Sequence, residues 1–325
     1  MAAADQIKSL IKSFGDGDED RFFASAMLIA ASEARKGHTT FAQELKSLIE
    51  KAKKNRSVSF LDRSKTIPIN QSKRDLHELI EVFQPKIKLK DMILAPTVQE
   101  SLMKVVNEQK KWEILRQHNL MPRRKLLLQG PPGCGKTMTA QAIAGELVIP
   151  VFIVRLDGLI SKFMGESIAK LRLIFDTMPD HRGVYLFDEF DSIGSHRNQG
   201  QDVGEIKRVL NSFLINIEKD QSNSVIIAAT NMPEALDKAL FRRFDDIITY
   251  PLPSKSEIID TIKKNLFGFK FNERINYEML AKEAFGLNYS DIVRACEETI
   301  KEMILHGDNK LKKSELIIAI KKRKS

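Results

Sequence analysis

Residues 130–137 read Gly-Pro-Pro-Gly-Cys-Gly-Lys-Thr and fit the P-loop pattern G-x-x-x-x-G-K-[ST]. An apolar run of strand length, Lys125–Gln129, precedes them, and a helix-forming run, Met138–Gly145, follows. Glycines let such a loop curl so that several backbone N–H groups point into one anion-sized hollow, and the N-terminus of the helix adds positive potential there. The stretch therefore predicts a strand–loop–helix unit that binds the phosphates of a nucleotide.

Individual residues of the loop have expected parts in binding ATP. Lys136 is expected to reach the β- and γ-phosphates, and the hydroxyl of Thr137 is expected to hold Mg²⁺. Cys134 is expected to be a small filler in the loop rather than a redox switch. The predicted ATP-binding set is Gly130, Pro131, Pro132, Gly133, Cys134, Gly135, Lys136, Thr137 and Met138.

Two carboxylates end the apolar run Val184–Phe187. At the mouth of a buried strand, Asp188 is expected to hold Mg²⁺ through a bound water, and Glu189 to orient and polarise the attacking water. A strand end with solvated acids is the alternative interpretation. The P-loop upstream favours the catalytic one.

A third polar position follows the apolar run Val225–Ala229. Asn231 at this strand end is expected to form a hydrogen bond to the γ-phosphate or to the attacking water. An asparagine that merely forms a turn is the alternative, because asparagine is common in turns.

Apolar runs of strand length alternate with helical stretches through the middle of the chain. The predicted strands are Lys125–Leu128, Val151–Val154, Gly183–Phe187 and Val225–Ala229. Continuous rather than alternating hydrophobicity is typical of parallel strands buried on both faces. The sequence therefore predicts an α/β fold with a parallel sheet, and ATP is expected at the carboxyl ends of its strands.

The chain is predicted to have four parts, because apolar density and periodicity change along it. These are an all-helical domain over residues 1–54, a linker over 55–89 with one short helix around 76–83, the ATPase subdomain over 90–253, and a helical lid with a basic tail over 254–325.

The 325 residues are 42% hydrophobic and 29% charged, which is typical of a soluble globular protein. No apolar run reaches the length of a membrane span, and the N-terminus does not resemble a secretory signal, so a cytoplasmic location without a membrane partner is expected. The net charge of +9 permits a nucleic-acid partner, but the basic runs at 51–56, 123–125 and 321–324 are more simply solvated charge. Cys134 and Cys296 are expected to be free thiols.

The order of the P-loop, Asp188-Glu189, Asn231 and Phe241–Asp245 resembles the AAA family of ATPases, and the likeness covers roughly residues 90–300. The resemblance implies a P-loop ATPase that uses ATP and Mg²⁺ and works as a homo-oligomeric ring, most often a hexamer. The chain is most similar to compact bacterial AAA proteins with one ATPase module and a short helical N-terminal domain. Such a domain commonly recruits a protein substrate or a partner enzyme.

Residues 235–245 resemble the family's second region of homology, whose arginines reach into the ATP site of the neighbouring subunit. The resemblance implies Arg242 and Arg243 in this part, with Arg243 preferred, because a guanidinium stays charged and can bridge phosphate oxygens. A surface basic pair is the alternative. Asp246 stands where some members of the family carry a further arginine.

Residues 161–167 resemble the family's pore loop, in which an aromatic–aliphatic–glycine step grips an unfolded polypeptide. An aromatic face suits this task because it packs on many kinds of side chain. The alternative is that the aromatic ring merely packs under a loop. The resemblance implies a substrate-contacting set of Lys162, Phe163, Met164 and Gly165.

Residues 285–292 resemble the start of the lid helix that senses the nucleotide. The family's usual Ser-Gly-Ala-Asp step is here Asn288-Tyr-Ser-Asp291, so the small pair is replaced. Arg294 lies one turn further on and is not assigned as a sensor arginine. The adenine pocket is expected to involve backbone near residues 91–94.

Three functions follow as hypotheses. The first is an ATP-driven remodeller or unfoldase of a protein substrate. The second is an ATP-gated regulatory ring that controls a partner enzyme, such as a protease. The third is a nucleic-acid remodeller or loader, whose binding would weaken steeply with salt.

Overall fold

The structure is a computed structural model that describes residues 25–27, 29–33, 37–38, 41–49, 79–156, 166–191, 203–236 and 238–324. The chain divides into two compact units, Met1–Pro68 and Ile69–Ser325. In the first unit, residues 41–49 form a helix whose Ala42 and Ile49 are buried, and residues 25–27 and 29–33 are helical. In the described part of the chain, no helix is both long and apolar enough to cross a bilayer.

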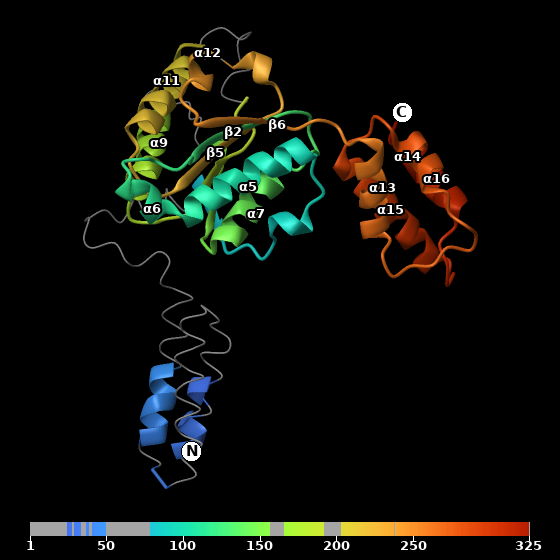
Figure 1. The fold of residues 1–325 in the computed structure, drawn as a ribbon, viewed down its shortest axis with the longest axis horizontal. Coiled ribbons are helices and arrows are strands. Elements are labelled where there is room, and N and C mark those ends of the chain that lie inside the picture. The colour runs from blue at the N-terminus through green and yellow to red at the C-terminus, as the bar shows by residue number, and fades with distance from the viewer. Residues whose placement is uncertain are drawn as a thin grey trace. The chain divides into compact units, whose positions relative to one another are not determined.

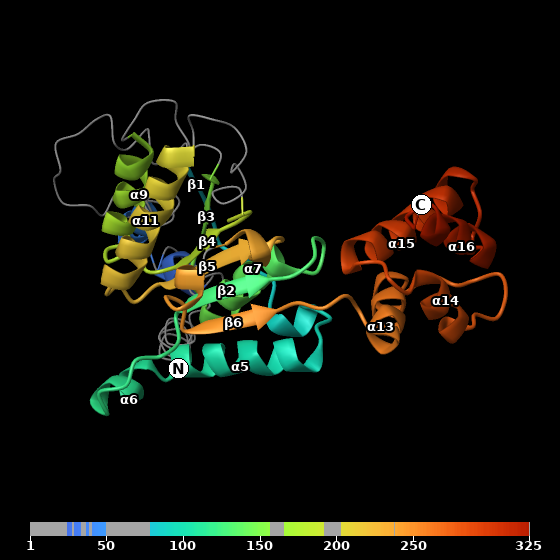
Figure 2. The same cartoon turned by 90° about the horizontal axis from the view of Figure 1, so that it is seen from above.

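The second unit is built on a six-stranded sheet in the order β1-β3-β4-β5-β2-β6, seen from two directions in Figures 1 and 2. All neighbouring strands are parallel except β1, which pairs antiparallel with β3. The strands are β1 (Ile80–Phe83), β2 (Lys125–Gln129), β3 (Val151–Val154), β4 (Val184–Phe187), β5 (Val225–Thr230) and β6 (Asp246–Thr249). The predicted α/β fold with a mainly parallel sheet is confirmed.

Helices cover both faces of this sheet, which is why its central strands are continuously apolar. On one face, α9 (Glu166–Thr177) and α11 (Val203–Lys219) pack on alternate strand residues such as Phe187 and Ala228. On the other face, α5 (Pro96–Lys110) and α7 (Lys136–Leu147) pack on the intervening residues. Figures 1 and 2 show the two helix pairs on opposite sides of the sheet.

Shorter elements connect these layers. They are the 3-10 turns η1 (Leu89–Asp91) and η3 (Pro233–Ala235) and the helices α6 (Trp112–Gln117) and α12 (Lys238–Phe241).

The two edge strands differ from the sequence-based interpretation. Residues 80–83, assigned there to a short helix within a linker, form β1, whose residues Ile80 and Phe83 pair with Val154 and Val151. The helix prediction is wrong at these residues, because pairing with β3 outweighs the weak local preference of a four-residue segment. The sheet therefore begins inside the range predicted as a linker. Strand β6 at the opposite edge was not predicted.

The lid follows β6 and has a hydrophobic core of its own. Its helices are α13 (Lys255–Asn265), α14 (Tyr277–Ala284), α15 (Tyr289–Leu305) and α16 (Lys313–Lys321). Fully buried residues such as Ile262, Leu280, Ile292 and Ile320 form that core. A capping box begins the first lid helix, where the Ser254 hydroxyl accepts from the Glu257 N–H and the Glu257 carboxylate accepts from the Ser254 N–H.

Candidate nucleotide site

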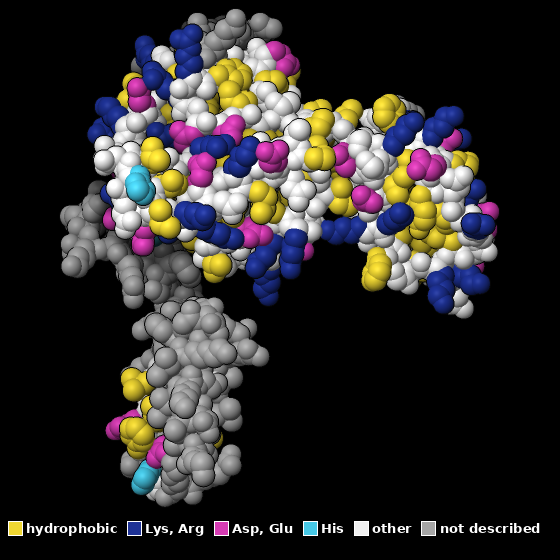
Figure 3. Space-filling model, in the orientation of Figure 1, with side chains coloured by type: hydrophobic (Ala, Val, Ile, Leu, Met, Phe, Trp, Pro, Cys, Tyr) yellow, Lys and Arg dark blue, Asp and Glu magenta, His cyan; other side chains and the backbone are white. Residues whose placement is uncertain are grey.

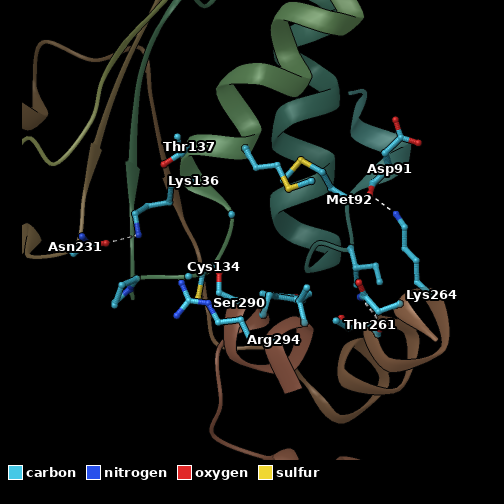
Figure 4. Close-up of a pocket in the computed structure, with 18 of the residues that line it drawn as sticks. Asp91, Met92, Cys134, Lys136, Thr137, Asn231, Thr261, Lys264, Ser290 and Arg294 are labelled. Atoms are coloured by element: carbon cyan, nitrogen blue, oxygen red, sulfur yellow. Dashed lines mark hydrogen bonds between the residues drawn. The ribbon is translucent and has the colours of Figure 1, made fainter. Parts of the chain in front are cut away.

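A pocket of about 720 Å³ opens at the carboxyl ends of β2, β4 and β5. Its walls come from four sources: residues 91–93, the P-loop with the start of α7, the polar residues that follow β4 and β5, and the lid helices α13 and α15. Figure 4 shows that the labelled side chains converge from these separate segments. Ligands of open α/β sheets bind outside the carboxyl ends of the strands, so the pocket lies where the fold favours one.

The P-loop takes backbone conformations that need glycine at two close contacts. Gly130 has φ +141°, and a Cβ there would lie 2.3 Å from the carbonyl oxygen of Tyr250. Gly133 has φ +72°, and a Cβ there would lie 2.6 Å from Oδ1 of Asn288 in the lid. Both positions combine a left-handed φ with a neighbour too close for any side chain. The loop is thus wedged between the end of the sheet and the lid.

Lys136, the first residue of α7, extends its ammonium group along the inside of the loop. Its Nζ donates hydrogen bonds to the carbonyl oxygens of Gly130 and Pro131, both at 2.8 Å, and to Oδ1 of Asn231 at 2.7 Å. Burial lowers the pKa of Lys136, while the nearby carboxylates of Asp188 and Asp191 oppose that change. A partly desolvated cation in this position can bind phosphate oxygens strongly.

Thr137 and Asp188 place two hard oxygen atoms side by side. The Thr137 hydroxyl donates to Oδ2 of Asp188 at 2.6 Å. No group of three or more His, Cys, Asp and Glu that could hold a metal occurs among the described residues. Because Mg²⁺ commonly binds one or two protein oxygens together with phosphates and water, these two residues fit an ion shared with a nucleotide.

Glu189 is exposed at the pocket and has an unusual backbone conformation. Its φ is +49°, although it is not a glycine, and its N–H donates to Oδ1 of Asp188 at 2.9 Å. A left-handed conformation costs a non-glycine residue on the order of 1–2 kcal/mol and occurs often at functional sites. The bend keeps two successive carboxylates at the mouth of one pocket.

The backbone of Asn231 is hydrogen-bonded to Asp191, a residue that the sequence interpretation missed. Oδ1 of Asp191 accepts hydrogen bonds from the backbone N–H of Asn231 at 3.1 Å and from the hydroxyl of Thr230 at 2.9 Å. Asp191 does not line the pocket itself. The sequence signal that could have revealed it is a third acid, which lies three residues after Asp188 and follows the pair Asp188-Glu189.

Cys134 is a buried residue of the loop. Burial raises the pKa of its thiol, so the group stays protonated and apolar at neutral pH. Cys296 is a buried free thiol in the lid core, and burial raises its pKa to about 12.

Arg242 and Arg243 do not reach the pocket of their own chain. Both are exposed, neither lines the pocket, and Nη1 of Arg243 pairs with Oε1 of Glu218 at 2.8 Å. Asp245, at the end of the same motif, has a structural role. Its Oδ2 accepts hydrogen bonds from the backbone N–H groups of Arg124 and Lys125, both at 2.9 Å. This anchors the start of β2, the strand that leads into the P-loop.

The predicted pore-loop residues, Lys162, Phe163, Met164 and Gly165, lie outside the described residues. The segment expected near adenine does line the pocket, through residues 91–93.

The lid forms a large part of the pocket wall. Lys264 donates to the carbonyl oxygen of Asp91, and the N–H of Ser290 donates to the carbonyl oxygen of Gly133 at 3.1 Å. Figure 4 shows Ser290 and Arg294 beside Cys134, with Thr261 and Lys264 below Met92. The lining residues from the lid are Thr261, Lys264, Asn265, Tyr289, Ser290, Val293, Arg294 and Glu297.

Comparison with known proteins agrees with this geometry. Residues 126–252 match the family described as ATPase family associated with various cellular activities (AAA). The AAA family ATPase y4kL of Sinorhizobium fredii is 34% identical over 94% of this chain and 90% of its own. The proteasome-activating nucleotidase of Saccharolobus islandicus is 32% identical over 79% of this chain and 70% of its own.

A homologue of cell division cycle protein 48 from Archaeoglobus fulgidus is 34% identical over 70% of this chain, which spans only 32% of that relative. Because the first of these likenesses extends over nearly the whole of both proteins, and the matched family region contains the loop, both acids and the asparagine, the chain belongs to the AAA family of ATPases.

Proposed function

We propose that this AAA ATPase is Mg²⁺-dependent, hydrolyses ATP as a homo-oligomeric ring of six subunits, and uses the cycle to remodel or unfold a protein substrate in the cytoplasm. The convergence of four polar side chains in one pocket supports the chemical part of this proposal. Lys136 donates to Asn231 at 2.7 Å, and Thr137 donates to Asp188 at 2.6 Å, although these pairs come from three separate segments.

The P-loop set from Gly130 to Met138 would bind the nucleotide phosphates. The Lys136 ammonium would exchange its loop carbonyl partners for β- and γ-phosphate oxygens, and Asn231 would hold the γ-phosphate or the attacking water. A magnesium ion held through Thr137 and Asp188 would neutralise charge on the phosphates. The protein groups thus bind and orient the phosphate that is transferred.

Glu189 would polarise the attacking water. Its carboxylate lies at the mouth of the pocket. The Thr137 hydroxyl donates its hydrogen bond to Asp188 and not to Glu189. Water attacks the γ-phosphorus, the bond to the β–γ bridging oxygen breaks, and the proton of the water is drawn toward the carboxylate. ADP and inorganic phosphate are the products.

A neighbouring copy would complete the site. Arg242 and Arg243 are exposed and lie outside the pocket of their own chain, which supports a role in the pocket of another subunit. A guanidinium can bridge phosphate oxygens as charge develops on them, and such arginines contribute on the order of 10³-fold or more to kcat. Specific activity should therefore depend on assembly.

Steady-state ATPase activity measured against protein concentration tests this part. We expect specific activity to rise with concentration in the wild type. Glu189→Gln should lose on the order of 10²-fold or more of kcat, and Arg243→Ala on the order of 10³-fold or more. Arg116→Ala, an exposed arginine on α6 away from the pocket, is the matched control. Activity that is flat down to the lowest concentrations and intact in Arg243→Ala would contradict the arginine assignment.

The remodelling part rests on the pore-loop resemblance of Lys162, Phe163, Met164 and Gly165 and on the helical domain over residues 1–54 as the recruiting element. Fluorescently labelled, reduced and carboxymethylated casein is a suitable unfolded probe. Phe163→Ala should retain ATPase activity but lose the ATP-dependent mobility change of the casein label. A gripping role would be contradicted if the variant lost ATPase activity and the casein signal equally, or if it lost neither.

A regulatory ring is the second candidate, favoured by the likeness to a protein named proteasome-activating nucleotidase over 70% of that protein's length. In that case Phe163→Ala should retain control of the partner enzyme.

A nucleic-acid remodeller is less well supported, because Figure 3 shows Lys and Arg side chains interspersed with Asp and Glu on the face that it presents. Salt-dependent binding of a single-stranded oligonucleotide, insensitive to Phe163→Ala, would favour it instead.

A further inference from the structure

The start of α15 rests directly on the P-loop. The N–H of Ser290 donates to the carbonyl oxygen of Gly133 at 3.1 Å, and the side chain of Asn288 occupies the space that a Cβ on Gly133 would need. Asn288 also caps α15, since its Oδ1 accepts the N–H of Asp291 at 2.8 Å. The loop that binds phosphate and the first turn of this lid helix therefore form one contact.

Tyr289, which lies between Asn288 and Ser290, connects that contact to α13. Its ring packs against the hydrophobic cluster of the ATPase subdomain that includes Cys134 and Ile143, and partly buried Met92 packs on the same cluster. Its hydroxyl donates to Oε2 of Glu257 at 2.9 Å. The residue lines the pocket, so one side chain touches the ATPase core, the pocket and α13.

The hydrogen-bond partner of Tyr289 lies where the lid begins. Oε2 of Glu257 accepts the Tyr289 hydroxyl and also the backbone N–H of Ser254, at 2.9 Å each. Ser254 is the N-cap of α13, which follows β6 after a short connection. A hydrogen bond to a carboxylate is stronger than one between neutral groups. The hydroxyl thus links the first turn of α13 to a side chain that packs on the ATPase subdomain.

From this network we propose that Tyr289 is the positioning residue that holds the lid wall of the pocket against the P-loop, and that it sets nucleotide affinity through Glu257. The proposal rests on the proposed function of the pocket. If the hydroxyl is lost, the lid wall loses one of the contacts that place it around the ligand, and its position depends more on the hydrogen bonds of Lys264 with Asp91 and of Ser290 with Gly133. The residues proposed to contact the γ-phosphate, which follow β4 and β5 or lie in the P-loop, are not displaced directly.

Binding of mant-ADP to the full chain, together with steady-state KM and kcat for ATP, tests the proposal. Tyr289→Phe keeps the ring and should weaken mant-ADP binding about three- to tenfold, while Tyr289→Ala should weaken it more than tenfold. KM should rise by a larger factor than kcat falls. Tyr277→Phe, a lid tyrosine that does not line the pocket, is the control and should match the wild type in both measurements.

A double-mutant cycle separates positioning from simple packing. If the hydroxyl acts through Glu257, Tyr289→Phe combined with Glu257→Ala should weaken binding no more than the more severe single change. Additive effects, unchanged affinity in Tyr289→Phe, or a fall in kcat with unchanged KM would each overturn the proposal. If the wild type fails to bind mant-ADP at all, the nucleotide function itself is wrong, which is a separate result.

Discussion

The side-chain oxygen of Asn231 accepts a hydrogen bond from the ammonium group of Lys136 at 2.7 Å, across 95 residues of chain. This pair links the end of β5 to the P-loop before any phosphate enters. The same amide lies where a γ-phosphate bound by Lys136 would be within its reach. Asn231 is therefore expected to matter more for hydrolysis than for binding.

Replacing Asn231 by alanine is expected to lower kcat about 10²-fold, the usual effect of removing one preorganised donor from a site of developing charge. Affinity for mant-ADP should change only a few-fold. Single-turnover hydrolysis with excess enzyme measures the chemical step directly. Asn216→Ala on α11, which removes an amide bonded to the Ser212 hydroxyl on the same helix, is the control. A loss of affinity as large as the loss of rate would contradict this expectation.

Asp191→Ala is expected to slow hydrolysis about tenfold. The change leaves the N–H of Asn231 and the hydroxyl of Thr230 without their acceptor, and a rate factor of ten corresponds to about 1.4 kcal/mol, within the usual cost of an unsatisfied group. Asp191→Asn keeps an oxygen acceptor and should recover most of the rate. Recovery distinguishes an orienting role from a need for the negative charge itself. Asp176→Ala, which changes an exposed carboxylate on α9, is the control.

Nucleotide affinity is expected to fall as pH rises into the alkaline range. Burial lowers the pKa of Lys136 from its ordinary value of 10.5, and a bound phosphate favours the charged ammonium, so binding takes up a proton above the lowered pKa. Affinity should be full below that pKa and decline above it. Titrations with mant-ADP at fixed ionic strength, from about pH 7 to about pH 10, measure the decline.

The Cys134 thiol also lies beside Lys136, and burial raises its pKa. The decline should therefore persist in Cys134→Ser. A profile that became flat in this variant would assign the titration to the thiol rather than to the lysine.

Arg124→Met is expected to destabilise the protein by about 3–5 kcal/mol, because it leaves the carboxylate of buried Asp220 without its cation. Urea unfolding of the nucleotide-free protein measures the change. Arg124→Met combined with Asp220→Leu should recover much of the loss, since no buried charge then remains unpaired. Lys104→Met, which breaks an exposed pair with Glu100 on α5, should leave the midpoint unchanged.

The parts of the fold that were predictable are those whose signal is local in the chain. The P-loop and the central strands are continuous in sequence, and burial on both faces makes each strand apolar throughout. Strands β1 and β6 are four residues long and lie at the edges of the sheet, so their pairing depends on neighbours distant in sequence. Each also carries a charged residue, Glu81 or Asp246, and so lacks the continuous apolar run that marks the equally short β3 and β4.

The site shows the same limit. Lys136, Asp188 and Asn231 were predictable because each stands in a recognisable local pattern. The contact of Tyr289 with Glu257 joins two lid helices 32 residues apart, and the contact of Ser290 with Gly133 joins the lid to the P-loop. No sequence pattern within either segment indicates that these residues are in contact. They follow from how the lid packs on the ATPase subdomain.

The lid core draws only on residues after Pro253, whereas every strand of the sheet lies before Tyr250. Every strand of the sheet therefore leaves the ribosomal exit tunnel before the lid helices do. Since domains tend to fold as their chain emerges, the nascent ATPase subdomain can close its hydrophobic layers while the lid is still being made. A nascent chain stalled with β6 outside the exit tunnel and the lid helices still inside it would then hold a folded sheet and a P-loop not yet covered by its lid.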